Sequence, residues 1–192
     1  MRHFLMGLVG AWSLVCLCSG AWAWQVTING SADRADIANA VTVDAAGNVI
    51  AVGWTDNKGT INDFTVIKLA GESGAELWRY GLNGTRAISN DIANAVTVDA
   101  AGDVLVAGVL DNSGTRGDLT VMKLAGSSGA ELWRAVINGT ANEFDVANAI
   151  AVDATGDVLA AGWTSHTSPR LLPRHEASFT VVKLRGIDGE GF

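Results

Sequence analysis

The chain has 192 residues, a formal net charge of −7 and 48% apolar residues, a composition typical of a globular protein, not of a disordered one. An acidic chain without a block of Lys and Arg binds nucleic acid poorly, because phosphate contacts need clustered positive charge. We therefore expect no nucleic-acid partner.

The first 23 residues are typical of a cleavable signal peptide. Arg2 and His3 precede an apolar stretch from Phe4 to Cys18, and Ala21-Trp22-Ala23 fits the small-x-small rule for cleavage. The alternative is an uncleaved membrane anchor, but the stretch is shorter than the roughly 20 residues of a spanning helix. The expected domains are a signal peptide (1–23) and an exported domain (24–192) that is periplasmic, surface-bound or secreted. No membrane span is expected after cleavage.

Both cysteines, Cys16 and Cys18, lie within this signal segment. The chain after residue 23 therefore offers no thiol for a disulfide or for cysteine chemistry. A lipoprotein signal would need small residues before the cysteine, but Val15 and Leu17 stand there.

The rest of the chain carries one pattern three times, in units 24–77, 78–132 and 133–192 that each begin with Trp. The run Ala38–Gly47 recurs at Ala93–Gly102 and, with three changes, at Ala147–Gly156. Periods of this length are typical of repeat architectures, in which each unit is one supersecondary element.

Each unit contains four strand candidates, which in the first unit are 38–44, 48–54, 64–69 and 76–82. Val, Ile, Thr, Phe and Trp fill these runs, and Gly, Asn, Asp and Ser separate them. Both alternate sets of residues in Val49–Trp54 are largely apolar, which indicates a sheet packed on both faces, as propeller blades are. We expect an all-β fold of three four-stranded antiparallel propeller-like blades, with the Ala-rich strand of each blade near the axis.

Several spaced elements together resemble the bacterial β-propeller repeat known as the SBBP repeat. These elements are Val-Asp-x-x-Gly-Asn/Asp-Val-x-x-x-Gly, Asp-Phe-Thr-Val-x-Lys-Leu and Gly-x-x-Leu-Trp. The resemblance covers all three units and implies a propeller in a secreted or surface-exposed bacterial protein, with no activity attached. A weaker resemblance is to the quinoprotein propellers, through Gly74–Trp78 and Gly129–Trp133. In that family the Trp packs between blades, which implies structural roles for Trp78 and Trp133.

Three blades are fewer than the 4–8 of typical closed propellers. The sequence also stops within the motif, because Leu184–Phe192 aligns with Leu69–Leu77, one residue before the next expected Trp. Two blade faces would then be apolar and uncovered, so we expect self-association or another protein partner, with a six-bladed two-fold pair as one form. A truncated fragment of a longer repeat protein is the alternative.

Two recurring charged positions are candidate sites. The aspartates of Asp-x-x-Gly-Asn/Asp could bind calcium, but a tight turn needs the same residues, and we favour the turn. The lysines inside apolar strands could be nucleophiles, but three equivalent copies favour structural ion pairs with these aspartates. The positions are Asp44, Asp99 and Asp153, and Lys68, Lys123 and Lys183.

Two further features are weighed in the same way. Asn29, Asn83 and Asn138 each begin Asn-Gly-Ser/Thr, which is a glycosylation acceptor but also a preferred turn pair, and the turn is favoured. His166 and His175 lie in a long insertion of unit three, where two histidines without a third ligand make a weak metal site.

No residue is therefore assigned a catalytic, cofactor-binding or metal-binding role, and no cofactor is expected. The leading hypothesis is an exported, non-enzymatic module for binding or assembly. The alternative is a partial or remnant enzyme related to quinoprotein propellers, although its paired-cysteine site has no counterpart after residue 23.

Overall fold

The computed structural model describes residues 23–167 and 175–191, and these residues form twelve β-strands and no helix. The expectation of an all-β fold is therefore confirmed. The expected signal peptide falls, except for Ala23, outside the described residues. Within the described part of the chain, no helix has the length and apolarity needed to cross a bilayer.

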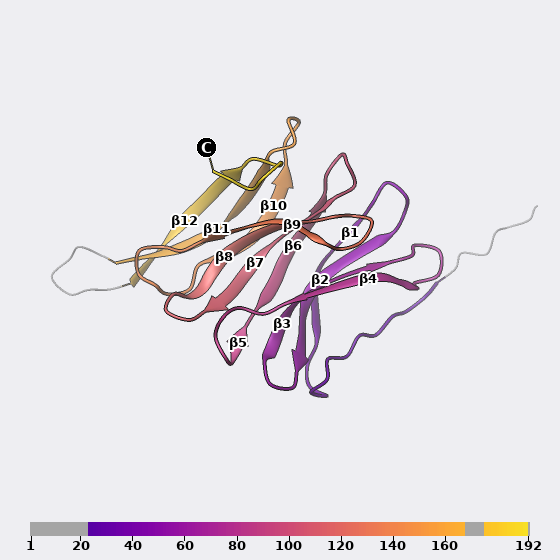
Figure 1. The fold of residues 1–192 in the computed structure, drawn as a ribbon, viewed down its shortest axis with the longest axis horizontal. Coiled ribbons are helices and arrows are strands. Elements are labelled where there is room, and N and C mark those ends of the chain that lie inside the picture. Colours follow the sequence, from indigo (N-terminus) through magenta and orange to yellow (C-terminus); the bar gives the residue numbers. More distant parts are fainter. Residues whose placement is uncertain (1–22, 168–174, 192) are drawn as a thin grey trace, which may run out of the picture.

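The strands form three antiparallel sheets that follow one another along the chain (Figure 1). In each sheet the strands pair in sequence order. The first sheet contains β1 (Ile37–Val43), β2 (Val49–Asn57), β3 (Ile61–Leu69) and β4 (Glu76–Leu82). The second contains β6 (Ile92–Val98), β7 (Val104–Asn112), β8 (Arg116–Leu124) and β9 (Glu131–Ile137). The third contains β10 (Val146–Val152), β11 (Val158–Thr167) and β12 (His175–Leu184).

The expectation of three four-stranded sheets is thus met in the second sheet and corrected in the others. In the first sheet, the two-residue strand β5 (Ser89–Asn90) adds a short parallel pairing to β3. The third sheet has three strands within the described residues. In the first two sheets the fourth strand follows the turn after the third strand. In the described part of unit three, Gly191 follows that turn and forms a single bridge with Leu184.

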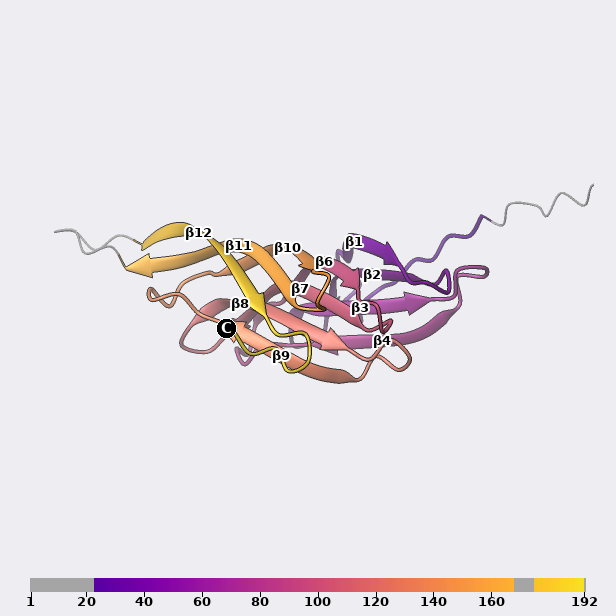
Figure 2. The same ribbon diagram turned by 90° about the horizontal axis from the view of Figure 1, so that it is seen from above.

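The sheets stack face to face and share two apolar cores (Figure 2). One core lies between the first and second sheets and includes Phe64, Val66 and Met122. The other lies between the second and third sheets and includes Leu119, Val121 and Val158. The run Val104–Leu110 of the middle sheet is buried throughout. Sheets covered on both faces are what the near-continuous apolar strands predict.

The first strands of the three sheets lie side by side along one edge of the stack (Figure 1). In each of them the pairing skips one Asn at a β-bulge, which lies between Ala38 and Ala40 in β1. The bulged Asn39 donates its Nδ2 to the carbonyl of Ala93 at 2.9 Å, and Asn94 donates to Ala147 in the same way at 2.9 Å. The bulge therefore turns a side-chain donor toward the next sheet.

Two tryptophans join neighbouring sheets on the other side of the stack. Trp78 of β4 and Trp133 of β9 are both 8% exposed. Their Nε1 atoms donate to carbonyls of the following sheet, Gly126 and Gly186, at 3.1 Å each. The expectation that Trp78 and Trp133 pack between adjacent units is confirmed.

Candidate functional site

Each sheet carries one lysine that pairs with an aspartate of its first hairpin turn, and Lys123 and Lys183 each pair with a second aspartate, Asp103 and Asp157. Lys68 Nζ lies 2.8 Å from Asp44 Oδ2, and Lys123 Nζ lies 2.9 Å from Asp99 Oδ2. The third pair, Lys183 and Asp153, is 2.8 Å apart. The predicted pairing of the strand lysines with the turn aspartates is confirmed at all three positions.

Two of these lysines also bind the next sheet. Lys68 Nζ donates to the carbonyl of Gly126 at 2.7 Å, and Lys123 Nζ donates to that of Gly186 at 3.2 Å. The tryptophans described above use the same two carbonyls. A lysine and a tryptophan of one sheet therefore converge on one turn of the next.

The charges in these pairs reinforce each other. Burial opposes ionisation of Asp99, but hydrogen bonds from Lys123 and from the backbone of Asp103 outweigh it and lower the pKa of this carboxyl. Burial also opposes the charge on Lys123, yet Asp99 and Asp103 raise the pKa of the ammonium above its ordinary 10.5. A lysine acting as a nucleophile needs the opposite shift, so Lys123 is built as an ion-pair partner.

The aspartates of these pairs also shape their turns. Asp44 Oδ1 accepts the backbone N–H of Ala46 at 2.9 Å and that of Asn48 at 2.8 Å. Gly47 adopts a φ of 83°, in the region that favours glycine. Equivalent bonds fold the turns at Asp99 and Asp153. Because the carboxylates are occupied in this way, the turn interpretation explains them without calcium. No group of three His, Cys, Asp or Glu suited to a metal occurs among residues 23–167 and 175–191.

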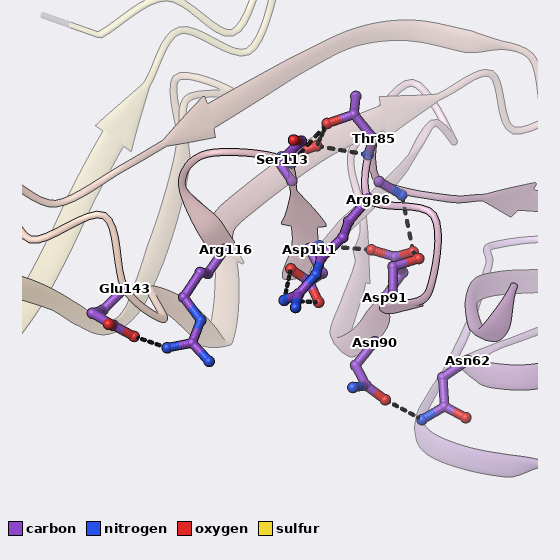
Figure 3. A network of polar contacts seen from close by, with 12 residues as sticks. Asn62, Thr85, Arg86, Asn90, Asp91, Asp111, Ser113, Arg116 and Glu143 are labelled. Carbon is purple, nitrogen blue, oxygen red and sulfur yellow. Dashed lines mark hydrogen bonds and ion pairs between the residues drawn. The ribbon is translucent and has the colours of Figure 1, made fainter.

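A second row of aspartates lies at the opposite end of the sheets, and sequence reasoning missed it. Asp91 is completely buried; its Oδ1 accepts the N–H of Asp111 at 2.7 Å, and its Oδ2 accepts that of Gly84 at 2.9 Å (Figure 3). Asp36 and Asp145 make the same pairs of bonds in their own units. The available signal was an Asp directly before each Ile/Val-Ala-Asn-Ala word, at Asp36, Asp91 and Asp145.

Each of these aspartates ties the loop before a sheet to the end of that sheet's second strand. Burial raises the pKa of Asp91, and the nearby charge of Asp111 adds to this, while hydrogen bonds from Ser89, Gly84 and Asp111 oppose it. A hydroxyl of Ser89 donates to Asp91 Oδ2 at 2.6 Å. Both carboxylate oxygens are thus used by the protein itself, which makes Asp91 a loop clamp.

The Asn-Gly pairs lie in these clamped loops and do not form the tight turn that we predicted. Gly84 does not have a positive φ, unlike the turn glycines. A Cβ placed on it would lie 2.1 Å from the carbonyl oxygen of Asp111. Gly30 and Gly139 face the same obstacle, at 2.0 Å from Asp56 and 2.1 Å from Ser165. Glycine is therefore needed here for close approach of two backbones.

Other polar contacts at this end join strand ends and loops (Figure 3). Asn62 of β3 donates to Asn90 of β5 at 2.9 Å. Arg116 lies 2.5 Å from Glu143, and its guanidinium also stacks over Phe144 at 5.2 Å. These contacts hold loops and strand ends together.

The insertion of unit three continues the hairpin between β11 and β12. His166 pairs with Glu176 across this hairpin, and Thr167 pairs with His175. His166 Nε2 lies 3.1 Å from the hydroxyl of Thr164. The tip of the insertion, including both prolines, lies outside the described residues. The two histidines are therefore on opposite strands of an extended hairpin.

A polar hollow of about 350 Å³ borders the first sheet. Its lining includes Asp63, Asn57 and Arg79. Asp63 Oδ1 is buried and accepts no hydrogen bond, while Oδ2 accepts one from Asn57. With a single carboxylate and an arginine in its lining, this hollow is poorly suited to a divalent cation.

An apolar hollow with a volume of about 450 Å³ lies on the outer face of the first sheet. Part of its lining comes from β1 to β3, and part from the segment that precedes β1. The sheet residues include Val41, Val49, Ala51, Ile67 and Leu69, and the preceding segment contributes Trp24, Val26 and Ile28.

A comparison of the chain with protein-family models and with curated proteins gives no match.

Proposed function

We propose that this chain is an exported, non-enzymatic β-propeller-type module whose role is assembly through the two ends of its sheet stack. The proposal depends most on one comparison among equivalent residues of β3, β8 and β12. Phe64 and Leu119 are 0% exposed, whereas Phe179 is 87% exposed. Val66 and Val121 are buried between sheets, whereas Val181 is 56% exposed.

The opposite end of the stack offers the surface that these side chains need. Phe64 and Val66 of the first sheet pack against Val104, Met122 and Leu124 of the second. The equivalent positions of the first sheet are Val49, Ile67 and Leu69, which line the apolar hollow. The two ends are therefore complementary in the same way as the two faces that meet inside the stack.

Exposed apolar surface of this kind marks an interaction site in a soluble protein. The polar networks support an assembly role as well, because their charged groups are engaged in holding turns and loops. We therefore favour assembly over the enzyme alternative, because the recurring lysines and aspartates are engaged with each other and with the backbone.

Light scattering coupled to size exclusion tests this function. We expect the full chain to have a mass above that of one chain at micromolar concentration. Phe179→Glu should shift it to the single-chain mass, because a charge would be placed in the apolar contact. Leu132→Glu is the matched control, since Leu132 is 52% exposed on β9, away from both ends. A single-chain mass for the unaltered protein at all concentrations would refute the assembly role.

A further inference from the structure

The segment before β1 has the side-chain pattern of a fourth strand, although it pairs with no strand among the described residues. Trp24, Val26 and Ile28 alternate along it and line the hollow on the first sheet. Trp78, Tyr80 and Leu82 of β4 alternate in the same way and pack against the second sheet.

The tryptophan contact is also the same. Trp24 Nε1 donates to the carbonyl of Gly71 at 2.8 Å, just as Trp78 donates to Gly126. A Cβ on Gly74 would lie 2.8 Å from the Trp24 ring, and a Cβ on Gly129 would lie 2.7 Å from the Trp78 ring. The segment 24–28 therefore occupies the place that the fourth strand of a preceding sheet would occupy.

The outer edge of β12 is the edge to which such a strand would pair. In the first sheet, β3 pairs with β4 through Lys68↔Trp78, Val66↔Tyr80 and Phe64↔Leu82. In the second sheet, β8 pairs with β9 in the same register, Lys123↔Trp133 and Leu119↔Ile137. Among the described residues, β11 pairs along the length of β12, and the other edge of β12 carries only the bridge Leu184↔Gly191.

The same register applied to the third sheet gives Lys183↔Trp24, Val181↔Val26 and Phe179↔Ile28. Within one chain this pairing is out of reach, because the segment and β12 lie at opposite ends of the stack in both views (Figures 1 and 2). A second copy of the chain, however, presents its own segment 24–28 together with the hollow that it lines.

The row of bulged asparagines ends at the same two surfaces. Asn39 donates to Ala93, and Asn94 donates to Ala147, both of which are completely buried. The next donor in the row, Asn148, is exposed and makes no such bond within the described residues. At the other end of the stack, Ala38 holds the position equivalent to Ala93 and Ala147, and it is also exposed. One end of the stack thus holds a donor and the other an acceptor.

We propose that two copies of this chain close on each other by strand addition. Residues 24–28 of one copy pair antiparallel with β12 of the other, in the register Val26↔Val181. Asn148 of each copy then donates to Ala38 of its partner, and Phe179 enters the hollow on the partner's first sheet. Extended segments commonly bind exposed sheet edges in this way.

A two-fold pair repeats this contact twice and brings six sheets into one ring. Six lies within the range of closed propellers, and two-fold symmetry is the commonest closed arrangement of identical chains. This inference rests on the proposed assembly function and adds to it the partner, the strand and the register.

Disulfide trapping tests the register in the full chain with Cys16→Ser and Cys18→Ser. Val26→Cys and Val181→Cys are placed in separate chains, which are mixed and oxidised gently. Both sites are exposed in the single chain, so neither change disturbs its core. We expect a covalent two-chain product on a non-reducing gel. Val26→Cys mixed with Leu132→Cys is the matched control and should give no such product.

Light scattering of the same mixtures before oxidation separates the two proposals. A two-chain mass with no more disulfide than the control would overturn strand addition and leave the assembly function intact. A single-chain mass at every concentration would overturn both. A two-chain mass with the disulfide formed by the Val26 and Val181 pair would support both.

Discussion

At the scale of single residues, the three lysine–aspartate pairs differ in how well they are covered. The side chain of Lys68 is 9% exposed and that of Lys183 is 44% exposed. Lys68 and Lys123 face a following sheet and bind one of its carbonyls, whereas Lys183 belongs to the last sheet. The same pair therefore stabilises the fold more where a second sheet excludes water, because exposed ion pairs are weak.

The middle pair makes a pH-dependent contribution that can be measured with Asp99→Asn. The lowered pKa of Asp99 gives stability that is present above the ordinary carboxyl pKa, about 4, and is lost as pH falls through the lowered value. Because the pKa of Lys123 is raised, its contribution to stability is fully present below pH 10.5 and is lost as the pH rises through the raised value. Between these limits the variant should lose about 1–3 kcal/mol of unfolding free energy, as expected for a partly buried charged hydrogen bond.

Urea unfolding from pH 3 to 9 measures this difference. The gap between Asp99→Asn and the unaltered protein should be constant above about pH 5 and should shrink below pH 4. Glu72→Gln is a control, because this carboxylate is exposed and makes no ion pair in the described chain. A gap that stays the same at pH 3 would show that the Asp99 charge does not contribute.

At the scale of strands and turns, local sequence patterns were sufficient for most of the sheets. The Asp-x-x-Gly turns were predictable because Asp bonds its own backbone and Gly takes a positive φ, as Gly47 and Gly102 do. The strands were predictable because they are apolar on both faces. The strand β5 was not predictable, since two residues carry no periodicity and their pairing with β3 depends on the tertiary path.

Contacts between units were harder to predict than the units themselves. The clamp made by Asp91 joins residues 20 positions apart, so it has no local signature beyond a recurring Asp. The role of Gly84 was misjudged for the same reason, because the neighbouring carbonyl of Asp111 comes from a distant strand. The apolar hollow was predictable only as an uncovered face, without its lining by Trp24.

The contact between β9 and the third sheet depends on Trp133, and Trp133→Ala measures how much this contact contributes to the free energy of unfolding. The ring is buried against Gly189, so its removal leaves a cavity and should cost about 3–5 kcal/mol of unfolding free energy. Trp133→Phe should cost less, because it keeps most of the packing and loses the hydrogen bond to Gly186. Both are measured by denaturant unfolding at one fixed protein concentration, since assembly would shift the midpoint. An unchanged midpoint for Trp133→Ala would contradict the inter-sheet role.

At the scale of the whole molecule, the middle sheet packs against more of its neighbours than the two outer sheets do. The second sheet packs against a neighbouring sheet on both faces, whereas the first and third each have a neighbouring sheet on one face only within the described residues. Local opening is easiest where few apolar contacts must break. The middle sheet should therefore be the most stable part. The strand β12 should open first, because its outer face is exposed and, among the described residues, its outer edge is bridged only at Leu184.

Amide hydrogen exchange measured at several protein concentrations tests this order together with the proposed closure. Amides of β7 and β8 should exchange slowest at every concentration, because both neighbouring sheets cover them. At the lowest concentration, amides of β12 and of residues 24–28 should exchange fast. As concentration rises they should slow together, because pairing between two copies protects both strands at once and follows mass action. Protection of β12 alone would show that something other than residues 24–28 covers its edge. The opposite outcome is that the amides of β12 and of residues 24–28 exchange at rates that do not change with concentration and that equal those in Phe179→Glu. That result would show that the two ends of the stack do not bind each other.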